Sequence, residues 1–316
     1  MDLCRTVYGL YYPETRRAVE ELWAERPHHW YERNYEKRQD AMHRGCLERW
    51  RAWADAAGVA LGDGFAHHYP TAGANEAIHA LLALHAARGG RRIHVFAGEY
   101  EGYTHLAAAL GLAVIAHARE PERYAASLAE HARAGDQFWI SQPSAIDGNL
   151  WPGFARFRDA LAAAAPGVSL IVDLTYVGAT AVEPRIELRE PPVAAVLWSL
   201  SKPFGVYYHR IGGLLSREEI PTLSGHHWFK NLFSLQLGER LLTTYNACEL
   251  PARYQARQRE ALAHCRANGQ IPDGARASDV VMLAHAPSAG DAFAEYARAG
   301  GLRFCLSPIM DRMINP

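Results

Sequence analysis

The hydrophobic positions of this chain follow a helical period at first and change character near residue 64. In the first sixty residues, Met42, Cys46, Trp50 and Trp53 recur at helical spacing, and Pro13 opens a stretch typical of a helix start. Trp and Met at this spacing are more typical of a core or a dimer contact than of a cofactor site. We therefore expect an N-terminal helical segment over residues 1–60.

After residue 64, short apolar runs alternate with alanine-rich stretches of helical period. The expected strands are residues 92–96, 112–117, 137–141, 168–173, 193–199 and 211–216. The expected helices are residues 75–88, 103–110, 122–133 and 154–164. This alternation is typical of a mostly parallel sheet covered by helices on both faces, which binds ligands beyond the carboxyl ends of its strands.

The last quarter of the chain has a different pattern. A long helical region is expected over residues 225–267, broken by Pro251. A strand near residues 279–284, a helix at 290–298 and a strand at 302–306 follow. The pattern indicates an α/β fold with a large domain over residues 61–240 and a small C-terminal α/β domain over residues 241–316.

Composition and the spacing of particular residues argue against several classes of protein. The 316 residues include 33 Lys and Arg against 34 Asp and Glu, a net charge of −1 that argues against a nucleic-acid binder. The longest uncharged run, residues 102–118, is too short for a membrane helix, and the N-terminus lacks the apolar region of a signal peptide. Five scattered cysteines predict reduced thiols and a cytoplasmic location. The 16 histidines show no metal-ligand spacing, so no metal site is expected.

Lysine is scarce, and one lysine stands in an unusual setting. Of the 33 basic residues only Lys37, Lys202 and Lys230 are lysines, so any amine chemistry has three candidates. Lys202 lies in the sequence WSLSKPFG, directly after an apolar run and beside the hydroxyls of Ser199 and Ser201. A surface lysine in a turn is the alternative. Lys37 lies in a charged helix and Lys230 among aromatic residues, so Lys202 is the preferred reactive residue.

Two further stretches are candidates for chemistry. Asp173 ends a buried apolar strand, where a carboxylate is costly unless a cation or hydrogen bonds meet it; a helix cap or loop acid is the alternative. The sequence YPTAGANE, residues 69–76, is a small-residue turn before a helix, whose N-terminus favours an anion. An ordinary helix start capped by Asn75 is the alternative there.

Taken together, these motifs resemble fold type I pyridoxal 5′-phosphate (PLP) enzymes of the class I and II aminotransferase type. The order DLTY, SLSK and arginine, with Arg210 eight residues after Lys202, matches the order of acid, tyrosine, Schiff-base lysine and phosphate arginine in that family. The resemblance extends over residues 69–216 and more loosely over the tail. It implies a large domain with a mostly parallel seven-stranded sheet between helices, and a small C-terminal domain.

The resemblance also implies a role for each matching residue. Lys202 would hold PLP as an internal aldimine and move protons at the substrate Cα, Asp173 would keep the ring nitrogen protonated, and Tyr176 would donate to the ring oxygen. Arg303 would bind the substrate α-carboxylate, with a surface arginine as the alternative. Tyr100 would stack on the ring. The residues implied to bind the phosphate are Gly73, Ala74, Asn75, Ser199, Ser201 and Arg210.

One departure from the family pattern affects the expected reaction. Ala145 stands where the family has an asparagine that also binds the ring oxygen, although Gln142 or Ser144 could replace that donor. Transamination of an amino acid in a homodimer with active sites at the interface is the first expectation. A lyase that eliminates a β or γ group, or cyclises the product, is nearly level with it. A non-catalytic sensor is disfavoured, because Lys202, Asp173 and Arg210 are all present.

Overall fold

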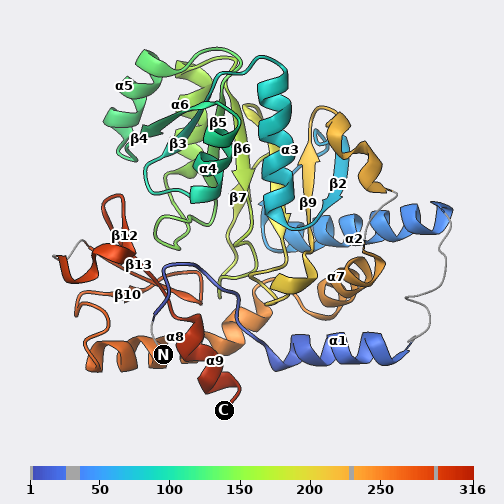
Figure 1. Ribbon diagram of the computed structural model, residues 1–316, viewed down its shortest axis with the longest axis vertical. Helices are drawn as coiled ribbons and strands as arrows, with labels where there is room; N and C mark the ends of the chain where they lie inside the picture. The colour runs from blue at the N-terminus through green and yellow to red at the C-terminus, as the bar shows by residue number, and fades with distance from the viewer. Residues whose placement is uncertain (1–2, 26–35, 228–230, 288–290) are drawn as a thin grey trace.

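A central sheet built from runs with few charged residues dominates the computed structural model, which describes residues 3–25, 36–227, 231–287 and 291–316 (Figure 1). Seven strands form this sheet in the order β2-β9-β8-β6-β5-β3-β4. Their bounds are β2 His67–Thr71, β3 Arg92–Phe96, β4 Ala113–His117, β5 Gln137–Ser141, β6 Ser169–Asp173, β8 Val193–Ser199 and β9 Gly212–Ser216. The strands from β8 to β4 pair in parallel, whereas β9 is antiparallel to both neighbours, so the expected mostly parallel seven-stranded sheet is confirmed.

Alternate residues of the central strands enter two separate cores, because successive side chains of a strand point to opposite faces. Phe138 and Ile140 of β5 belong to one buried cluster, and Trp139 between them belongs to the other. Helices α3 (Ala74–Ala87) and α4 (Glu101–Ala109) cover the second cluster, and α5 (Pro121–His131) and α6 (Phe154–Ala164) pack on the first. The sheet is therefore buried on both faces, as its apolar strands predict.

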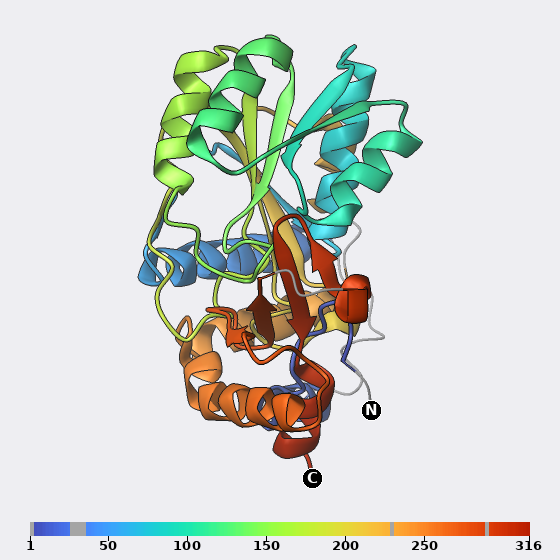
Figure 2. The ribbon, with the colours of Figure 1, turned by 90° about the vertical axis from the view of Figure 1, so that its left-hand side faces the viewer.

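A small C-terminal sheet and most of the remaining helices lie below the central sheet in Figures 1 and 2, toward the carboxyl ends of its parallel strands. A four-stranded antiparallel sheet has the order β10-β11-β13-β12. Its strands are β10 Arg276–Ala277, β11 Leu283–Ala286, β12 Ala297–Arg298 and β13 Gly301–Cys305. The neighbouring helices are α1 Pro13–Glu25, α2 Glu36–Ala56, α7 Leu232–Thr244, α8 Glu249–Ala267 and α9 Ser307–Ile314. Short elements complete the fold: β1 Val59–Ala60, β7 Ile186–Glu187, η2 Tyr207–His209, η3 Pro221–His227 and η4 Asp291–Tyr296.

Four details of the expected pattern are wrong. Residues 69–71, expected in a turn, belong to the edge strand β2, which pairs with β9 in spite of Pro70. The break in the long helical region falls at residues 245–248, and Pro251 sits in the first turn of α8, where a missing N–H is tolerated. The helix expected at residues 290–298 is the 3-10 helix η4 followed by β12. The strand expected near residues 279–284 is β11, which begins at Leu283. In the described part of the chain, no helix is long and apolar enough to cross a membrane.

Candidate active site

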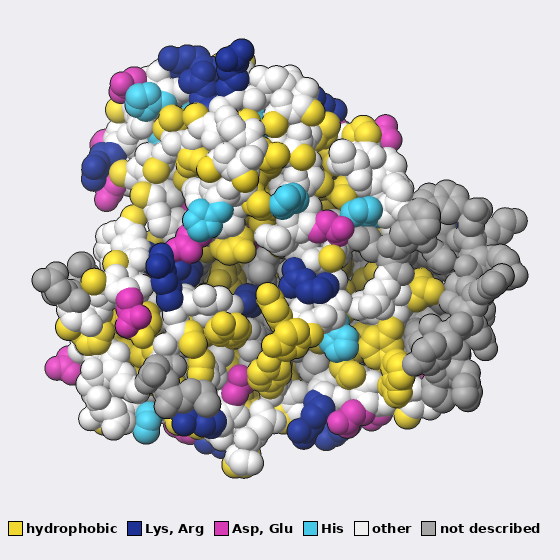
Figure 3. Space-filling model, in the orientation of Figure 1, with side chains coloured by type: hydrophobic (Ala, Val, Ile, Leu, Met, Phe, Trp, Pro, Cys, Tyr) yellow, Lys and Arg dark blue, Asp and Glu magenta, His cyan; other side chains and the backbone are white. Residues whose placement is uncertain are grey.

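A cavity of about 560 Å³ opens where the parallel strands end. Ser141, Asp173 and Ser199 are the last residues of β5, β6 and β8, and all three line it. The parallel register pairs Ser141 with Asp173, so the two side chains reach the same edge of the sheet. Figure 3 shows this face of the molecule hollowed at mid-height, with Lys and Arg side chains around the hollow.

Ten of the eleven residues expected at the site line this one cavity. They are Ala74, Asn75, Tyr100, Asp173, Tyr176, Ser199, Ser201, Lys202, Arg210 and Arg303. The eleventh, Gly73, is the N-cap of α3, directly before two of them. Residues from widely separated parts of the sequence therefore meet at the carboxyl edge of the sheet, where such folds bind ligands.

Lys202 is a partly buried amine on the loop that follows β8. Its Nζ donates a hydrogen bond to the carbonyl oxygen of Val7. Burial lowers the pKa of Lys202 to about 8; the guanidinium groups of Arg303 and Arg210 add to this effect, and Cys305 opposes it. A substantial fraction of the amine is therefore uncharged just above neutral pH. Lys230 lies outside the described residues, and Lys37 is on helix α2.

Asp173 is a buried carboxylate that three hydrogen bonds hold in place beside the cavity. The Tyr103 hydroxyl donates to Oδ2 at 2.8 Å, and the backbone N–H and hydroxyl of Thr175 donate to Oδ1 at 2.8 and 2.5 Å. Burial raises the pKa of Asp173, and these hydrogen bonds oppose the rise. A cationic N–H in the cavity would complete the compensation of this charge. Sequence reasoning missed Tyr103 and Thr175, although Tyr103 follows Tyr100, the N-cap of α4, by only three residues.

An anion cradle forms where α3 begins. Gly73 has a φ of +75°, and a Cβ added to it would lie 2.7 Å from Nη2 of Arg210, so this close approach requires glycine. The same Nη2 donates to the carbonyl oxygen of Ala72 at 2.9 Å, which fixes the guanidinium beside the helix N-terminus. The Ser199 and Ser201 hydroxyls are 3.0 Å apart on the facing loop. A helix N-terminus, a guanidinium and two hydroxyls suit a phosphate group. The N-cap of α3 is Gly73, so the alternative of a helix capped by Asn75 is wrong.

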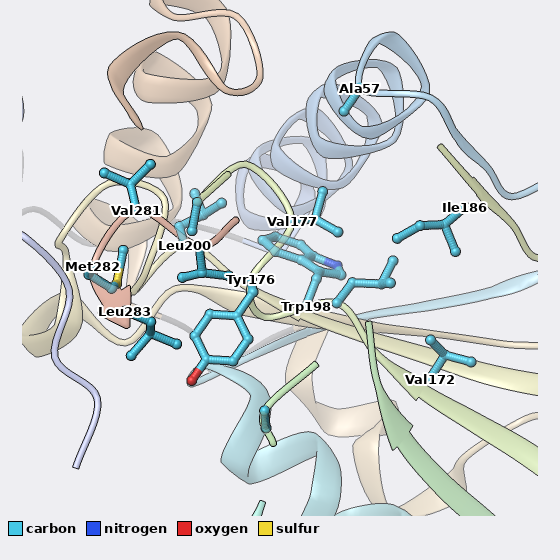
Figure 4. Close-up of a cluster of buried hydrophobic side chains, with 14 of the residues drawn as sticks. Ala57, Val172, Tyr176, Val177, Ile186, Trp198, Leu200, Val281, Met282 and Leu283 are labelled. Atoms are coloured by element: carbon cyan, nitrogen blue, oxygen red, sulfur yellow. The ribbon is translucent and has the colours of Figure 1, made fainter. Parts of the chain in front are cut away.

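Two of the tyrosines that line the cavity differ in burial. Tyr176 is buried, and its ring packs in the hydrophobic cluster with Leu200 and Leu283 while its hydroxyl points away from Trp198 (Figure 4). Burial raises the pKa of Tyr176 to about 12, so the hydroxyl keeps its proton at neutral pH and can donate it to an acceptor. Tyr100, by contrast, is 44 % exposed, and its ring meets that of Tyr103 edge-on at 5.4 Å. A face of Tyr100 is therefore accessible from solvent.

Ala145 has no side-chain hydrogen-bond donor, and the polar residues just before it in the sequence differ in whether they reach the cavity. Gln142 hydrogen-bonds the backbone of Trp151, and the Ser144 hydroxyl accepts from the N–H of Ile146. Neither lines the cavity, so the idea that one of them replaces the missing donor lacks support. Ser141 does line it.

The hydroxyl of Ser141 links the cavity to a buried acid. Ser141 donates to Glu99 at 2.6 Å and accepts from the N–H of Ala145 at 2.6 Å. Burial raises the pKa of Glu99 to about 7, although its hydrogen bonds to Ser141, Arg119 nearby and the N–H of Tyr100 oppose the rise. Among the residues that line the cavity, Ser141 therefore has the hydroxyl nearest in sequence to Ala145, and the pKa of its partner Glu99 is about 7.

Arg303 presents a pair of donors from β13. Its Nη1 donates to the carbonyl oxygen of Ala145, and its Nη2 is 3.4 Å from the carbonyl oxygen of Arg5. Its Nε has no hydrogen-bond partner within the described residues, although the side chain is buried. Nε and the weakly bonded Nη2 lie on the same side of the guanidinium, which is the arrangement that binds a carboxylate in a planar two-point contact.

The N-terminal segment, residues 3–12, closes one side of the cavity. Arg5, Thr6 and Val7 line it, and the segment is held by β13 and α9. The N–H of Cys305 donates to the carbonyl oxygen of Cys4 at 3.1 Å, and the Ser307 hydroxyl donates to that of Tyr8 at 2.7 Å. Sequence reasoning did not identify these cavity residues, because the contacts join the two ends of the chain and leave no local pattern.

Comparisons with known proteins agree with this fold. Residues 69–235 match the family model of aminotransferase class I and II. A histidinol-phosphate aminotransferase from Sinorhizobium meliloti, solved with PLP, aligns with a TM-score of 0.68 at 14 % identity, over 99 % of this chain and 90 % of that one. A protein described as a probable N-succinyldiaminopimelate aminotransferase from Thermus thermophilus gives a TM-score of 0.70 at 18 % identity, over 100 % and 92 %. No curated protein sequence matches the chain.

These structures share the fold of the chain, and the family model covers more than half of its length. The cavity offers what PLP requires, because an anion cradle, a buried carboxylate and an amine suit its phosphate, its ring nitrogen and its aldehyde. The chain therefore belongs to the class I and II aminotransferase family and is a PLP-dependent enzyme.

Proposed function

We propose that this protein transaminates an amino acid in the cavity at the carboxyl edge of the sheet, with PLP attached covalently to Nζ of Lys202. The observation that carries the proposal is the meeting of Lys202, Asp173 and Arg210 in one cavity. When bound, PLP withdraws electrons from the substrate and acidifies its Cα–H bond. The remaining functions belong to the side chains of this chain.

Each wall of the cavity supports one of these functions. The cradle of Gly73, Ala74, Asn75, Ser199, Ser201 and Arg210 would hold the phosphate. Asp173 would hold a protonated ring nitrogen, since its buried charge needs a cation. Tyr176 would donate its proton to the ring oxygen, and the exposed ring of Tyr100 would stack on the ring face. Tyr103 and Thr175 would position Asp173 through their hydrogen bonds.

Lys202 would also move the proton of the substrate. Burial lowers its pKa to about 8, so its amine can accept a proton near neutral pH and return it from the same nitrogen. The Nε and Nη2 donors of Arg303 would orient the substrate by binding its α-carboxylate. Ser141 would turn its hydroxyl proton toward the ring oxygen only when Glu99 is protonated and donates to the serine in turn.

A homodimer with active sites at the interface is part of the proposal. Tyr207, which lines the cavity, is 45 % exposed, and its neighbour Tyr208 is 78 % exposed. Exposed aromatic residues at the mouth of a site are typical of a surface that another chain covers. Light scattering would test this, because Tyr208→Glu should shift the protein toward monomer, whereas the same change at the exposed surface residue Val182 should not.

A lyase is the second candidate, and Ala145 is the observation that favours it. The missing amide changes the donors around the ring oxygen, and Ser141 shares its hydroxyl with Glu99. Elimination of a β or γ group would use the same lysine, acid and phosphate cradle.

The visible spectrum and the products separate these reactions. Purified protein loaded with PLP would be mixed with single amino acids, and absorbance, ammonia and keto acids would be followed. Transamination should give pyridoxamine phosphate and one equivalent of keto acid. Release of ammonia with return of the starting spectrum would support the lyase instead. A protein that cannot be reconstituted with PLP would contradict both.

A further inference from the structure

A carboxylate at the rim of the cavity is shared by two arginines from distant parts of the chain. Arg298 of β12 donates to Oε1 of Glu101 at 2.7 Å, and Arg5 of the N-terminal segment donates to the same oxygen. All three side chains line the cavity. The Arg298 side chain is 10 % exposed, against 42 % for Glu101 and 54 % for Arg5. A largely buried guanidinium therefore shares its partner oxygen with a second cation.

The charged residues that line the cavity do not balance. The cations are Arg5, Lys202, Arg210, Arg298 and Arg303, and the acids are Glu101 and Asp173. The proposed function gives four of these residues a partner. Arg210 would bind the phosphate, Arg303 the α-carboxylate and Asp173 the ring nitrogen, and Lys202 would bind PLP covalently. Arg5, Arg298 and Glu101 remain, with one positive charge in excess. Arg5 is partly solvated, so the excess charge is tolerated without a ligand, but it makes this end of the cavity attractive to an anion.

The hairpin of β12 and β13 places this excess charge beside the proposed α-carboxylate site. Arg298 pairs with Gly301, two residues before Arg303 on β13. Residues two apart on a strand share a face with the residue opposite the first, so Arg298 and Arg303 are diagonal neighbours on the same face. The charge of Arg298 contributes to the lowered pKa of Arg303, after burial and against Tyr176, which opposes it. A substrate held by Arg303 would therefore extend its side chain within reach of Arg298.

We propose that Arg298 and Arg5 form a second anion subsite, which binds a carboxylate or phosphate on the side chain of the amino acid substrate. Glu101 holds the two guanidinium groups in position and competes with the substrate for them. The inference rests on the proposed function, since it assigns the substrate class of the same site. It makes this protein selective for amino acids with an anionic side chain over neutral ones of the same shape.

Matched ligand pairs test the subsite. Kinetics of the PLP-loaded protein would compare glutamate with glutamine and O-phosphoserine with serine, which distinguishes carboxylate from phosphate. Calorimetry would compare glutarate with its monoamide, which requires no turnover. We expect kcat/KM to favour at least one anionic member by about 30-fold, in the range found for a buried charge pair, and glutarate to bind more tightly than the monoamide.

Two variants separate a subsite from a structural contact. Arg298→Gln should lower the anionic-to-neutral ratio of kcat/KM by about 30-fold. Glu101→Gln should raise that ratio by about threefold, because it removes the competing carboxylate at a partly exposed position. Arg257→Gln is the matched control, since it breaks an Arg257–Glu260 pair on α8, away from the cavity, and should leave the ratio unchanged.

The outcomes are distinct. If Arg298→Gln and Glu101→Gln both weaken anionic and neutral substrates by the same factor, the three residues only hold the N-terminal segment, and the subsite is contradicted. Efficient transamination of neutral amino acids without preference would overturn the subsite and leave the proposed function intact. Tight glutarate binding without any turnover would support the subsite and contradict the proposed function.

Discussion

The cavity has two walls of different origin. The cofactor wall consists of Ser141, Asp173, Ser199 and the loop that carries Lys202, which are fixed by the register of parallel strands. The substrate wall consists of the N-terminal segment and the β12–β13 hairpin, which are fixed by contacts between the two ends of the chain. A sheet edge can hold one cofactor in place, while terminal segments can change with the substrate. The comparison implies that substitutions on the two walls should affect different measurements.

The largest effect is expected on the cofactor wall, at Asp173. Asp173→Asn keeps the shape and much of the hydrogen bonding but removes the charge that stabilises a protonated ring nitrogen. We expect kcat to fall by roughly 10³-fold, as for other losses of a buried group that stabilises charge in the transition state. Steady-state kinetics with saturating PLP would measure it. The exposed acid Asp159 supplies the control, because Asp159→Asn should change kcat by less than about twofold. If kcat of Asp173→Asn fell by tenfold or less, the protonation of the ring nitrogen would not depend on Asp173.

Arg303 on the substrate wall should give the next largest effect, on a different quantity. Arg303→Gln removes the side-on donor pair, so KM for the amino acid should rise by about 100-fold while the dissociation constant of PLP changes little. Amino-acid kinetics and PLP titration monitored by absorbance would measure the two constants. An equal loss of affinity for PLP and for the amino acid would contradict the division into two walls.

The pKa of Lys202 predicts a smaller, pH-dependent effect. Burial disfavours the ammonium form and lowers this pKa to about 8, so the neutral, nucleophilic amine is the minor form below pH 8 and the major form above it. The rate of covalent PLP attachment to cofactor-free protein should therefore rise about tenfold between pH 7 and pH 9 and then level off. Stopped-flow absorbance would follow it. A rate that keeps rising to pH 10.5 would show an ordinary, solvated lysine.

The smallest effect is expected from the backbone contact that joins the two walls. A Cβ added to Gly9 would lie 2.3 Å from the carbonyl oxygen of Ser201, so Gly9→Ala should displace the N-terminal segment. We expect the free energy of unfolding to fall by about 1 kcal/mol. Gly274, which has no atom within 4 Å of an added Cβ, is the control, and Gly274→Ala should stay within about 0.5 kcal/mol. Chemical denaturation would measure both, and equal effects would show that the contact at Gly9 carries no constraint.

The two walls also differ in what the sequence reveals. The cofactor wall follows from apolar runs that end in polar residues, so Asp173 and Lys202 stand out in the sequence alone. Strand β2 was missed because Pro70 and two histidines disguise an edge strand. Arg5 and Arg298 could not be found, because they meet at Glu101 across 96 and 197 residues. Contacts of this kind depend on the whole fold and have no local period.

The central claim is that Lys202 is the residue that binds PLP covalently. Borohydride reduction of the PLP-loaded protein, followed by peptide mass mapping, tests it most directly. The account predicts one modified peptide that contains Lys202, and loss of that modification in Lys202→Ala but not in Lys37→Ala or Lys230→Ala. A modification that persists in Lys202→Ala, on Lys230 or elsewhere, would contradict the claim.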